Sequence, residues 1–440
     1  EIKIEPIVSN NSYEFKIRSE ILGDIGKAQK GTVGRQGATC IVSGAAIPLS
    51  YIREQAKKGQ MGQTLVAIAL ERRGGKIYVA PSPNEPFIAA QYIEDDIPSG
   101  QIDHWPGCTN CVVYGMDNFS LLFNERQGKS LIDFSNNIPK VIEEMEVDFN
   151  EHLAKADNNF LKDEFETYKL AITILLSFSL DRALDFNNTL TGWRPGNEKI
   201  MYLFSRHAIP MVWDYGEANI FENVVGGMPS IIKYQAKCLA KIPTNKIGKA
   251  IQADAQTLNY GKHAVVSTDP PYYDNVPYSN LSDFFYIWLR KNLHSFIPEL
   301  FSTMMVPKQE ELVANQFRHG SKSNAERHFL DGMKKTFKNM ADKVSNDFPV
   351  TIYYAFKQSE FEAEGLASTG WATFLTAIFE SGFAINRTWP VRTESSSRLR
   401  ALGSNALANS VVLVCRKREI FAEMITRAEF IRYLKQELPP

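Results

Sequence analysis

The chain has 440 residues, with 49 Lys and Arg against 50 Asp and Glu, so its formal net charge is −1. A balance this close gives no sign of a general polyelectrolyte hold on nucleic acid, so any DNA contact must come from local basic patches. The sequence has no stretch of about 18 uncharged apolar residues, which indicates a non-membrane protein. Five cysteines, an odd number, and the lack of a signal peptide predict a cytoplasmic location.

Residues 1–115 are predicted to form a β-rich region. Apolar and polar residues alternate over 2–8 and 13–17, which is typical of a β-hairpin. From 116 to 228 the period changes: apolar residues recur at helical spacing, and the run 160–178 predicts a long helix. We therefore expect a mostly helical insertion between the β-rich region and the rest of the chain.

Residues 229–420 alternate between expected helices and strands, and 421–440 are predicted to be a C-terminal helix or tail. The expected helices span 230–239, 281–293, 329–344 and 369–381, and the expected strands span 250–255, 265–268, 349–356, 383–389 and 410–415. Such alternation, closing on a hairpin of two late strands, predicts an α/β fold with a Rossmann-like sheet.

One stretch in this region carries a catalytic motif. The apolar run from Val265 ends at the tetrad Asp269-Pro270-Pro271-Tyr272, the pattern of a loop at the carboxyl end of a buried parallel strand. Open α/β sheets bind ligands at such loops. The tetrad matches the motif of S-adenosylmethionine-dependent methyltransferases that act on exocyclic amines, chiefly adenine N6 and in some cases cytosine N4. A proline-rich turn after a strand is the alternative.

The methylation of an aromatic amine explains these residue types. The lone pair of such an amine is delocalised into its ring, so acceptors for the N–H groups must help it localise on nitrogen. Asp269 and the carbonyl of Pro270 are the expected acceptors, and Pro271 helps to hold that carbonyl in one direction. Tyr272 is expected to offer a ring face to a base taken out of its stack.

The sequence around the tetrad, and several segments far from it, resemble one family of DNA methylases. These segments are residues 193–200, 210–215, 269–291, 351–357 and 405–416. They are similar to those of the large adenine-specific DNA methylases that contain a zinc ribbon. The resemblance implies S-adenosylmethionine as cofactor, double-stranded DNA as substrate and transfer to a flipped base, chiefly to adenine N6. It also implies a place in restriction-modification or phage defence, with helicase or nuclease partners.

The resemblance also places a zinc ribbon in the β-rich region. The family has a Cys-x-x-Cys-Gly knuckle there, whereas this sequence has Cys40 followed by Ser43, and serine is a poor zinc ligand. His104, Cys108 and Cys111 lie further on and make, with Cys40, four potential ligands. We keep both interpretations, a bound zinc ion and a degenerate zinc-ribbon-like module without metal.

Cofactor-binding residues are predicted only in part. In methyltransferases of this fold an acid at a strand end binds the adenine amino group of the cofactor, which makes Asp254 a candidate beside Asp269. A helix N-cap is the alternative role of Asp254. The family's glycine-rich loop and ribose-binding acid are not found in this sequence, which begins at Glu1 rather than at Met. We expect the chain to be the later part of a longer protein, with another polypeptide or an N-terminal segment supplying that loop.

Further residues are expected to contact DNA. Residues 308–328 are basic and polar, which predicts a DNA-facing loop or a solvated helix face. The candidate DNA-binding residues are Tyr273, Arg290, Lys291, Arg318, Arg392 and Arg398. Two other interpretations of the chain stay open, a cytosine-N4 methyltransferase and a non-catalytic DNA-binding or assembly subunit that keeps the fold.

Overall fold

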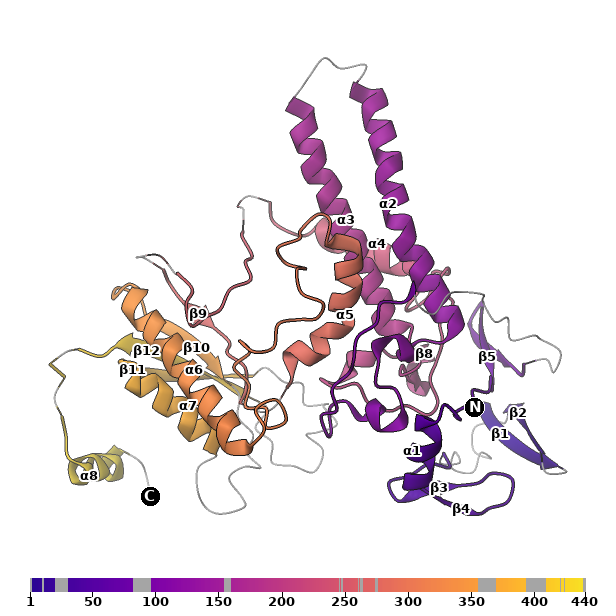
Figure 1. Ribbon diagram of the computed structural model, residues 1–440, viewed down its shortest axis with the longest axis horizontal. Helices are drawn as coiled ribbons and strands as arrows, with labels where there is room; N and C mark the ends of the chain where they lie inside the picture. Colours follow the sequence, from indigo (N-terminus) through magenta and orange to yellow (C-terminus); the bar gives the residue numbers. More distant parts are fainter. Residues whose placement is uncertain are drawn as a thin grey trace. The chain divides into compact units, whose positions relative to one another are not determined.

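The computed structural model describes most of the chain (Figure 1). The described residues are 2–9, 12–19, 31–81, 96–153, 160–244, 246, 248–259, 261, 264–273, 276–354, 369–392, 409–419, 421–422 and 424–437. They belong to two compact units. Unit 1 contains Glu1–Gly248 and Tyr278–Lys308, and unit 2 contains Lys249–Pro277 and Gln309–Pro440. The chain therefore leaves unit 2 shortly after the tetrad and returns to it at Gln309.

These units divide the chain differently from the expected regions 116–228 and 229–420. Residues 229–248 and 278–308, expected in the catalytic region, belong to unit 1. Among the described helices, none is both long and apolar enough to cross a bilayer.

The first part of unit 1 contains small antiparallel hairpins, within residues 1–115 that we expected to be β-rich. The paired strands are β1 (Ile2–Ser9) with β2 (Ser12–Ser19), β3 (Gly37–Thr39) with β4 (Ala46–Pro48), and β5 (Ile68–Arg72) with β6 (Gly75–Val79). Helix α1 (Leu49–Lys57) follows β4, and β7 (Trp193–Arg194) pairs with β8 (Lys199–Ile200) later in the chain. Each hairpin is a separate two-stranded sheet among the described strands.

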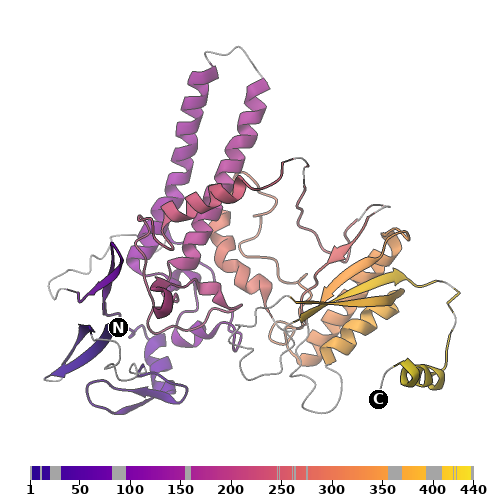
Figure 2. The same cartoon turned by 180° about the vertical axis from the view of Figure 1, so that it is seen from behind.

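Long helices form much of the rest of unit 1. α2 (Glu125–Leu153) and α3 (Phe160–Phe186) run side by side as an antiparallel pair (Figures 1 and 2). Helices α4 (Met228–Leu239) and α5 (Tyr278–Leu293) pack on α3. Short 3-10 helices span Asn110–Tyr114, Phe119–Leu122, Pro195–Asn197 and Leu203–Ser205. The helices predicted at 160–178, 230–239 and 281–293 are thereby confirmed.

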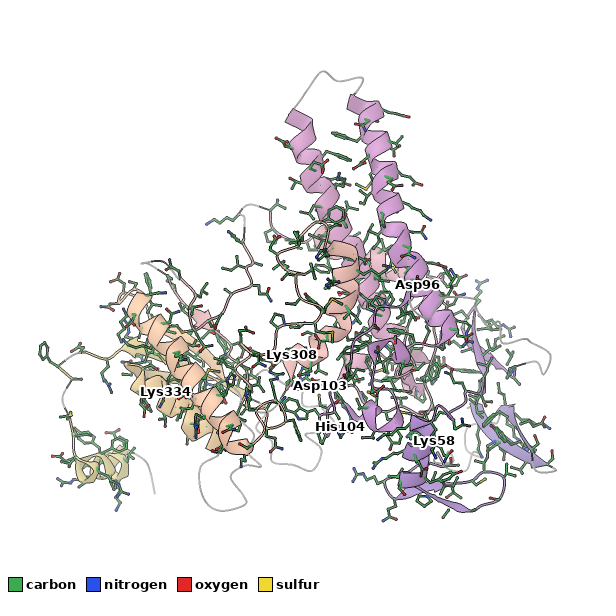
Figure 3. The ribbon with its side chains drawn as sticks, in the orientation of Figure 1. Lys58, Asp96, Asp103, His104, Lys308 and Lys334 are labelled. Carbon is green, nitrogen blue, oxygen red and sulfur yellow. The ribbon has the colours of Figure 1, made fainter. Side chains whose placement is uncertain are left out.

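Buried polar side chains fix α5 inside unit 1. Asn280 donates a hydrogen bond of 2.9 Å to Asp103, and Lys308 pairs with Asp283 over 2.7 Å; Figure 3 labels Asp103 and Lys308. Burial raises the pKa of the Asp283 carboxyl, and the hydrogen bond from Lys308 opposes that rise. Much of the segment that follows the tetrad therefore builds the core of unit 1.

Unit 2 is built on a four-stranded mixed sheet with the strand order β11–β12–β10–β9. The strands are β9 (Ser267–Thr268), β10 (Val350–Tyr354), β11 (Phe383–Arg392) and β12 (Asn409–Lys417). β9 is parallel to β10, and β12 is antiparallel to both β10 and β11. It follows that β9, β10 and β11 all point the same way, so their carboxyl ends share one edge of the sheet. The predicted late hairpin is β11 and β12.

Helices α6 (Lys322–Lys343) and α7 (Thr369–Glu380) pack against one face of this sheet. Phe329 and Phe337 of α6 and Phe374 of α7 are fully buried there with Ile352 of β10. Lys334 of α6, labelled in Figure 3, pairs with Glu380 of α7 over 2.5 Å. A further helix, α8 (Arg427–Glu437), lies within 421–440, where we expected a C-terminal helix or tail.

Three expectations for unit 2 need correction. The strand predicted at 250–255 does not form; residues 251–254 are unpaired and 255–257 make a turn. Helix α6 begins at Lys322 rather than at 329, because Ser321 caps it by accepting a hydrogen bond of 3.2 Å from the Asn324 amide. The tetrad strand is short and, within the described sheet, lies at an edge, which leaves Val265 63% exposed. A larger Rossmann-like sheet stays a prediction.

Candidate functional site

The tetrad lies where the sequence predicted it, at the carboxyl end of a parallel strand. β9 ends at Thr268, and Asp269 is the next residue. Ser267 is paired with Thr351 of β10, and the Thr351 amide donates 3.0 Å to the Val266 carbonyl. This pairing puts Asp269 at the sheet edge where parallel strands end, which is the usual place for ligands in open α/β sheets.

Asp269 and Tyr272 are joined by a hydrogen bond across the two prolines. The Tyr272 hydroxyl donates to Asp269 Oδ1 over 2.9 Å. Asp269 is exposed, whereas Pro270, Pro271 and Tyr272 are half-buried. An ionised carboxylate has about four lone-pair sites, so Asp269 can accept an amine N–H while it keeps this bond. The tyrosine hydroxyl thus orients the exposed Asp269 carboxylate.

An aromatic cluster supports Tyr272 from behind. Its ring makes an edge-to-face contact with Tyr354, with centroids 5.5 Å apart. Tyr354 ends β10, is 2% exposed and stacks on Phe374 of α7 at 3.9 Å. Trp371 of the same helix packs against Tyr354 at 5.5 Å. Such contacts hold the tetrad side chain in one orientation and supply π-faces next to it.

Tyr273 anchors the loop within unit 2. Its hydroxyl donates to Glu326 over 3.1 Å, its ring packs edge-to-face on Phe329, and its carbonyl accepts from the Ala314 amide at 2.9 Å. These contacts hold a backbone φ of +42°, a left-handed conformation that is strained for a bulky residue. They give Tyr273 a structural role, and its contact with DNA stays a prediction.

The structure gives Asp254 a local role. Its Oδ1 accepts hydrogen bonds from the Gln256 amide at 2.9 Å and from Gln256 Nε2 at 3.3 Å. Its carbonyl accepts from the Leu258 amide at 2.9 Å. Asn339 of α6 then holds the turn by donating to the carbonyls of Ala255 and Leu258. Asp254 therefore caps a turn, close to its alternative role as a cap. Among the described residues its Oδ2 accepts only a 3.4 Å bond from Gln256 Nε2, so this oxygen keeps acceptor capacity for a further N–H donor.

The arginines and the lysine predicted to contact DNA phosphates are divided between the two units. Arg318 is paired with Glu311 over 2.9 Å, and because their side chains are 10% and 13% exposed, that arginine is engaged inside unit 2. Arg290 donates from Nε to the Thr303 carbonyl in unit 1, where Lys291 is exposed. Arg392 ends β11, on the same sheet edge as the tetrad. Arg398 lies outside the described residues.

The sequence analysis did not identify a pocket of about 370 Å³ along α6, most of whose lining residues are polar or charged. It is lined by Gln256, Leu312, Asn324, Arg327, His328, Asp331, Gly332 and Lys335. Within the described chain, Arg327 and Lys335 have no ion-pair partner. His328 Nε2 lies 3.1 Å from the Glu311 carbonyl. The spacing of 327, 331 and 335, one residue every helical turn, is the signal that could have shown this face.

A second histidine supports the pocket. The ring of His319 stacks on that of His328 at 4.2 Å. The pKa of the His319 imidazole is lowered, chiefly by burial and then by the charges of His328 and Arg318, which favours a neutral ring. Arg327 and Lys335 beside the fixed His328 ring make the pocket suited to a phosphate group, with Asp331 as the opposing charge.

The four candidate zinc ligands do not gather at one site within the described residues. Burial raises the pKa of the Cys108 thiol to about 11 and that of Cys111 to about 12, and the Cys108 thiol donates to the His207 carbonyl at 3.3 Å. The Ser43 amide donates to Cys40 Sγ at 3.5 Å. Within the described ranges no three His, Cys, Asp or Glu side chains gather as a metal site would require. Both interpretations of this region, a bound zinc ion and a degenerate zinc-ribbon-like module without metal, therefore remain predictions.

Comparison of the chain with models of protein families, with curated proteins and with solved structures finds no match.

Proposed function

We propose that unit 2 is the target-amine half of an S-adenosylmethionine-dependent DNA methyltransferase that acts in the cytoplasm, with adenine N6 as the acceptor. The observation that carries the proposal is the hydrogen-bonded pair of Asp269 and Tyr272 at the carboxyl edge of a parallel strand pair. Proline-rich turns do not require an exposed acid oriented by an aromatic hydroxyl. A site that binds an amine for methylation does need an acceptor for the amine N–H groups, and an exposed, oriented carboxylate provides one.

The tetrad residues then have distinct tasks. Asp269 and the Pro270 carbonyl accept the N–H groups of the flipped base, so that the nitrogen lone pair points at the methyl donor. Tyr272, held by Tyr354, provides the aromatic surface against which the base rests. The cofactor supplies an electrophilic methyl group on a sulfonium. Asp269 would accept the proton that the amine loses on methylation and would release it to water.

The described part of unit 2 provides little grip for the cofactor itself. Its one predicted contact outside the tetrad, Asp254, is engaged by Gln256. The proposal therefore includes a glycine-rich loop from another polypeptide, or from another segment of a longer chain. The place in restriction-modification or phage defence, with helicase or nuclease partners, belongs to this proposal as well.

Calorimetric titration of S-adenosylmethionine tests the proposal, first into the chain alone and then into the chain with its co-purifying polypeptides. We expect saturable binding that needs the second polypeptide and weakens in an Asp269→Ala variant. Binding with the same affinity in that variant would show a cofactor site that does not involve the tetrad. The lack of binding in every mixture would favour the non-catalytic assembly subunit.

A further inference from the structure

The sheet of unit 2 has one face covered by α6 and α7 and a second face with exposed apolar side chains, on which neither of these helices packs. Because side chains alternate along a strand, Ile352 and Leu413 point to α6 and α7 and are buried. The neighbouring positions form a row across the sheet on the opposite face, where Tyr353 pairs with Val412 and Val412 pairs with Trp389. Tyr353 is 37% exposed and Trp389 is 56% exposed, and the two flank a buried Val412.

Parallel sheets have both faces covered, whereas antiparallel sheets can leave one face in water, normally a polar one. In this mixed sheet the second face carries Tyr353 and Trp389, two large side chains that are well exposed. In Figures 1 and 2, α6 and α7 lie on the same side of the sheet, and both pack on the face that holds Ile352 and Leu413. The open face thus leaves large apolar side chains in water, which is unfavourable by about 25 cal/mol for each Å².

Unit 2 also contains a helix whose apolar face is unused. Every residue of α8 is exposed, including Phe430, Ile431 and Leu434, which lie on one side of the helix. Phe421 and Met424, just before it, are almost fully exposed.

The helix is nevertheless well specified by its own sequence. Thr426 and Glu429 form a capping box: the Glu429 carboxylate accepts from the Thr426 amide at 2.7 Å, and the Thr426 hydroxyl accepts from the Glu429 amide at 3.2 Å. An isolated helix shorter than about 12 residues is marginal in water, so α8 requires a surface to pack on.

The two unused surfaces match in size and lie within reach of each other. An 11-residue helix is about 16 Å long, and four strands span about 14 Å. The connection from β12 to α8, residues 418–426, can extend to about 30 Å. Since both surfaces are on one chain, their effective concentration is in the millimolar range, well above that of a separate partner.

We propose that residues 421–437 fold back so that α8 covers the open face of its own sheet, with Phe430, Ile431 and Leu434 over the row of Tyr353, Val412 and Trp389. This inference does not depend on methyl transfer. The occupant is α8 rather than another protein because the tether and the apolar face are already present in the same unit.

Hydroxyl-radical footprinting of the full chain, read by mass spectrometry at Tyr353 and Trp389, tests the proposal. The disrupting variant is Phe430→Glu with Leu434→Glu. The matched control is Arg432→Gln with Gln436→Glu, which changes the net charge equally but on the opposite side of α8. We expect both reporters to be oxidised at least about threefold faster in the disrupting variant than in the wild type or the control.

Equal oxidation rates in all three proteins would overturn the proposal. Protection of Trp389 that increases with protein concentration, together with a dimer mass in light scattering, would also overturn it in favour of an exchange of α8 between two copies. Thermal unfolding of the three proteins shows whether the variants remain folded. Since the core beneath α6 and α7 does not include α8, we expect a cooperative transition in each. The disrupting variant should unfold about 2–8 °C below the control, because it loses the apolar contacts of α8 with the sheet.

Discussion

The Tyr272 hydroxyl donates a 2.9 Å hydrogen bond to Oδ1 of Asp269, three residues earlier in the chain. This bond and the Tyr354 contact give Tyr272 two separable roles, one through its hydroxyl and one through its ring. We expect Tyr272→Phe, which keeps the ring, to lower kcat/KM for methyl transfer by about 3- to 10-fold, and Tyr272→Ala by at least about 100-fold. Steady-state kinetics measure both. Equal losses in the two variants would show that the ring has no role of its own.

Gly332 lies where α6 meets Leu312. A Cβ at Gly332 would come within 2.2 Å of Leu312 Cδ2. We expect Gly332→Ala to lower the free energy of unfolding by about 1–3 kcal/mol, measured by urea denaturation. Gly196→Ala is the control, since nothing lies within 4 Å of its Cβ position. The double variant Gly332→Ala with Leu312→Val should lose less free energy of unfolding than the sum of the losses in the two single variants. A loss equal to that sum would contradict this packing.

Asp181 of α3 has a buried Oδ1 without a partner among the described residues. Burial raises the pKa of its carboxyl well above the ordinary value. Above the unfolded pKa of about 3.9, the folded state therefore retains a proton that the unfolded state has released, so stability falls as pH rises. Asp181→Asn removes this dependence. We expect the variant to match the wild type near pH 3 and to be more stable by about 1–3 kcal/mol at pH 8. A difference independent of pH would contradict the account.

Arg327 and Lys335 are the cations of the α6 pocket. If they hold DNA phosphates, the double change Arg327→Gln and Lys335→Gln should weaken DNA binding and reduce the slope of log affinity against log salt by about 2. The control is Lys334→Gln with Lys338→Gln on the same helix, since these lysines are paired with Glu380 and Asp342. Fluorescence anisotropy at several salt concentrations measures the slope. An equal effect of both pairs would mean that the pocket is not specific.

The sequence predicted the elements of unit 2 well where period and boundary signals agreed. The helix expected at 369–381 is α7, and the strands expected at 383–389 and 410–415 are β11 and β12. Their apolar patterns match one packed face, which local sequence records directly. The position of Asp269 followed from the same reasoning, because an acid after an apolar run marks a strand end.

Other site residues depended on contacts that a linear pattern does not contain. Arg318 looked available for phosphate but is paired with Glu311, seven positions away in an irregular segment. Asp254 followed an apolar segment, yet no strand pairs with that segment in the described structure, and the carboxylate caps a turn instead. α5 follows the tetrad but belongs to unit 1, because its polar residues Asn280 and Asp283 meet partners there.

Transfer of a labelled methyl group from S-adenosylmethionine to double-stranded DNA tests the central claim most directly. The wild-type chain and Asp269→Ala are each assayed with the co-purifying polypeptides, and the DNA is digested to nucleosides. We predict label in N6-methyladenine with the wild type and a loss of at least about 100-fold with Asp269→Ala. Labelling that is undiminished in Asp269→Ala, or no labelling of any DNA by the wild type, would contradict it.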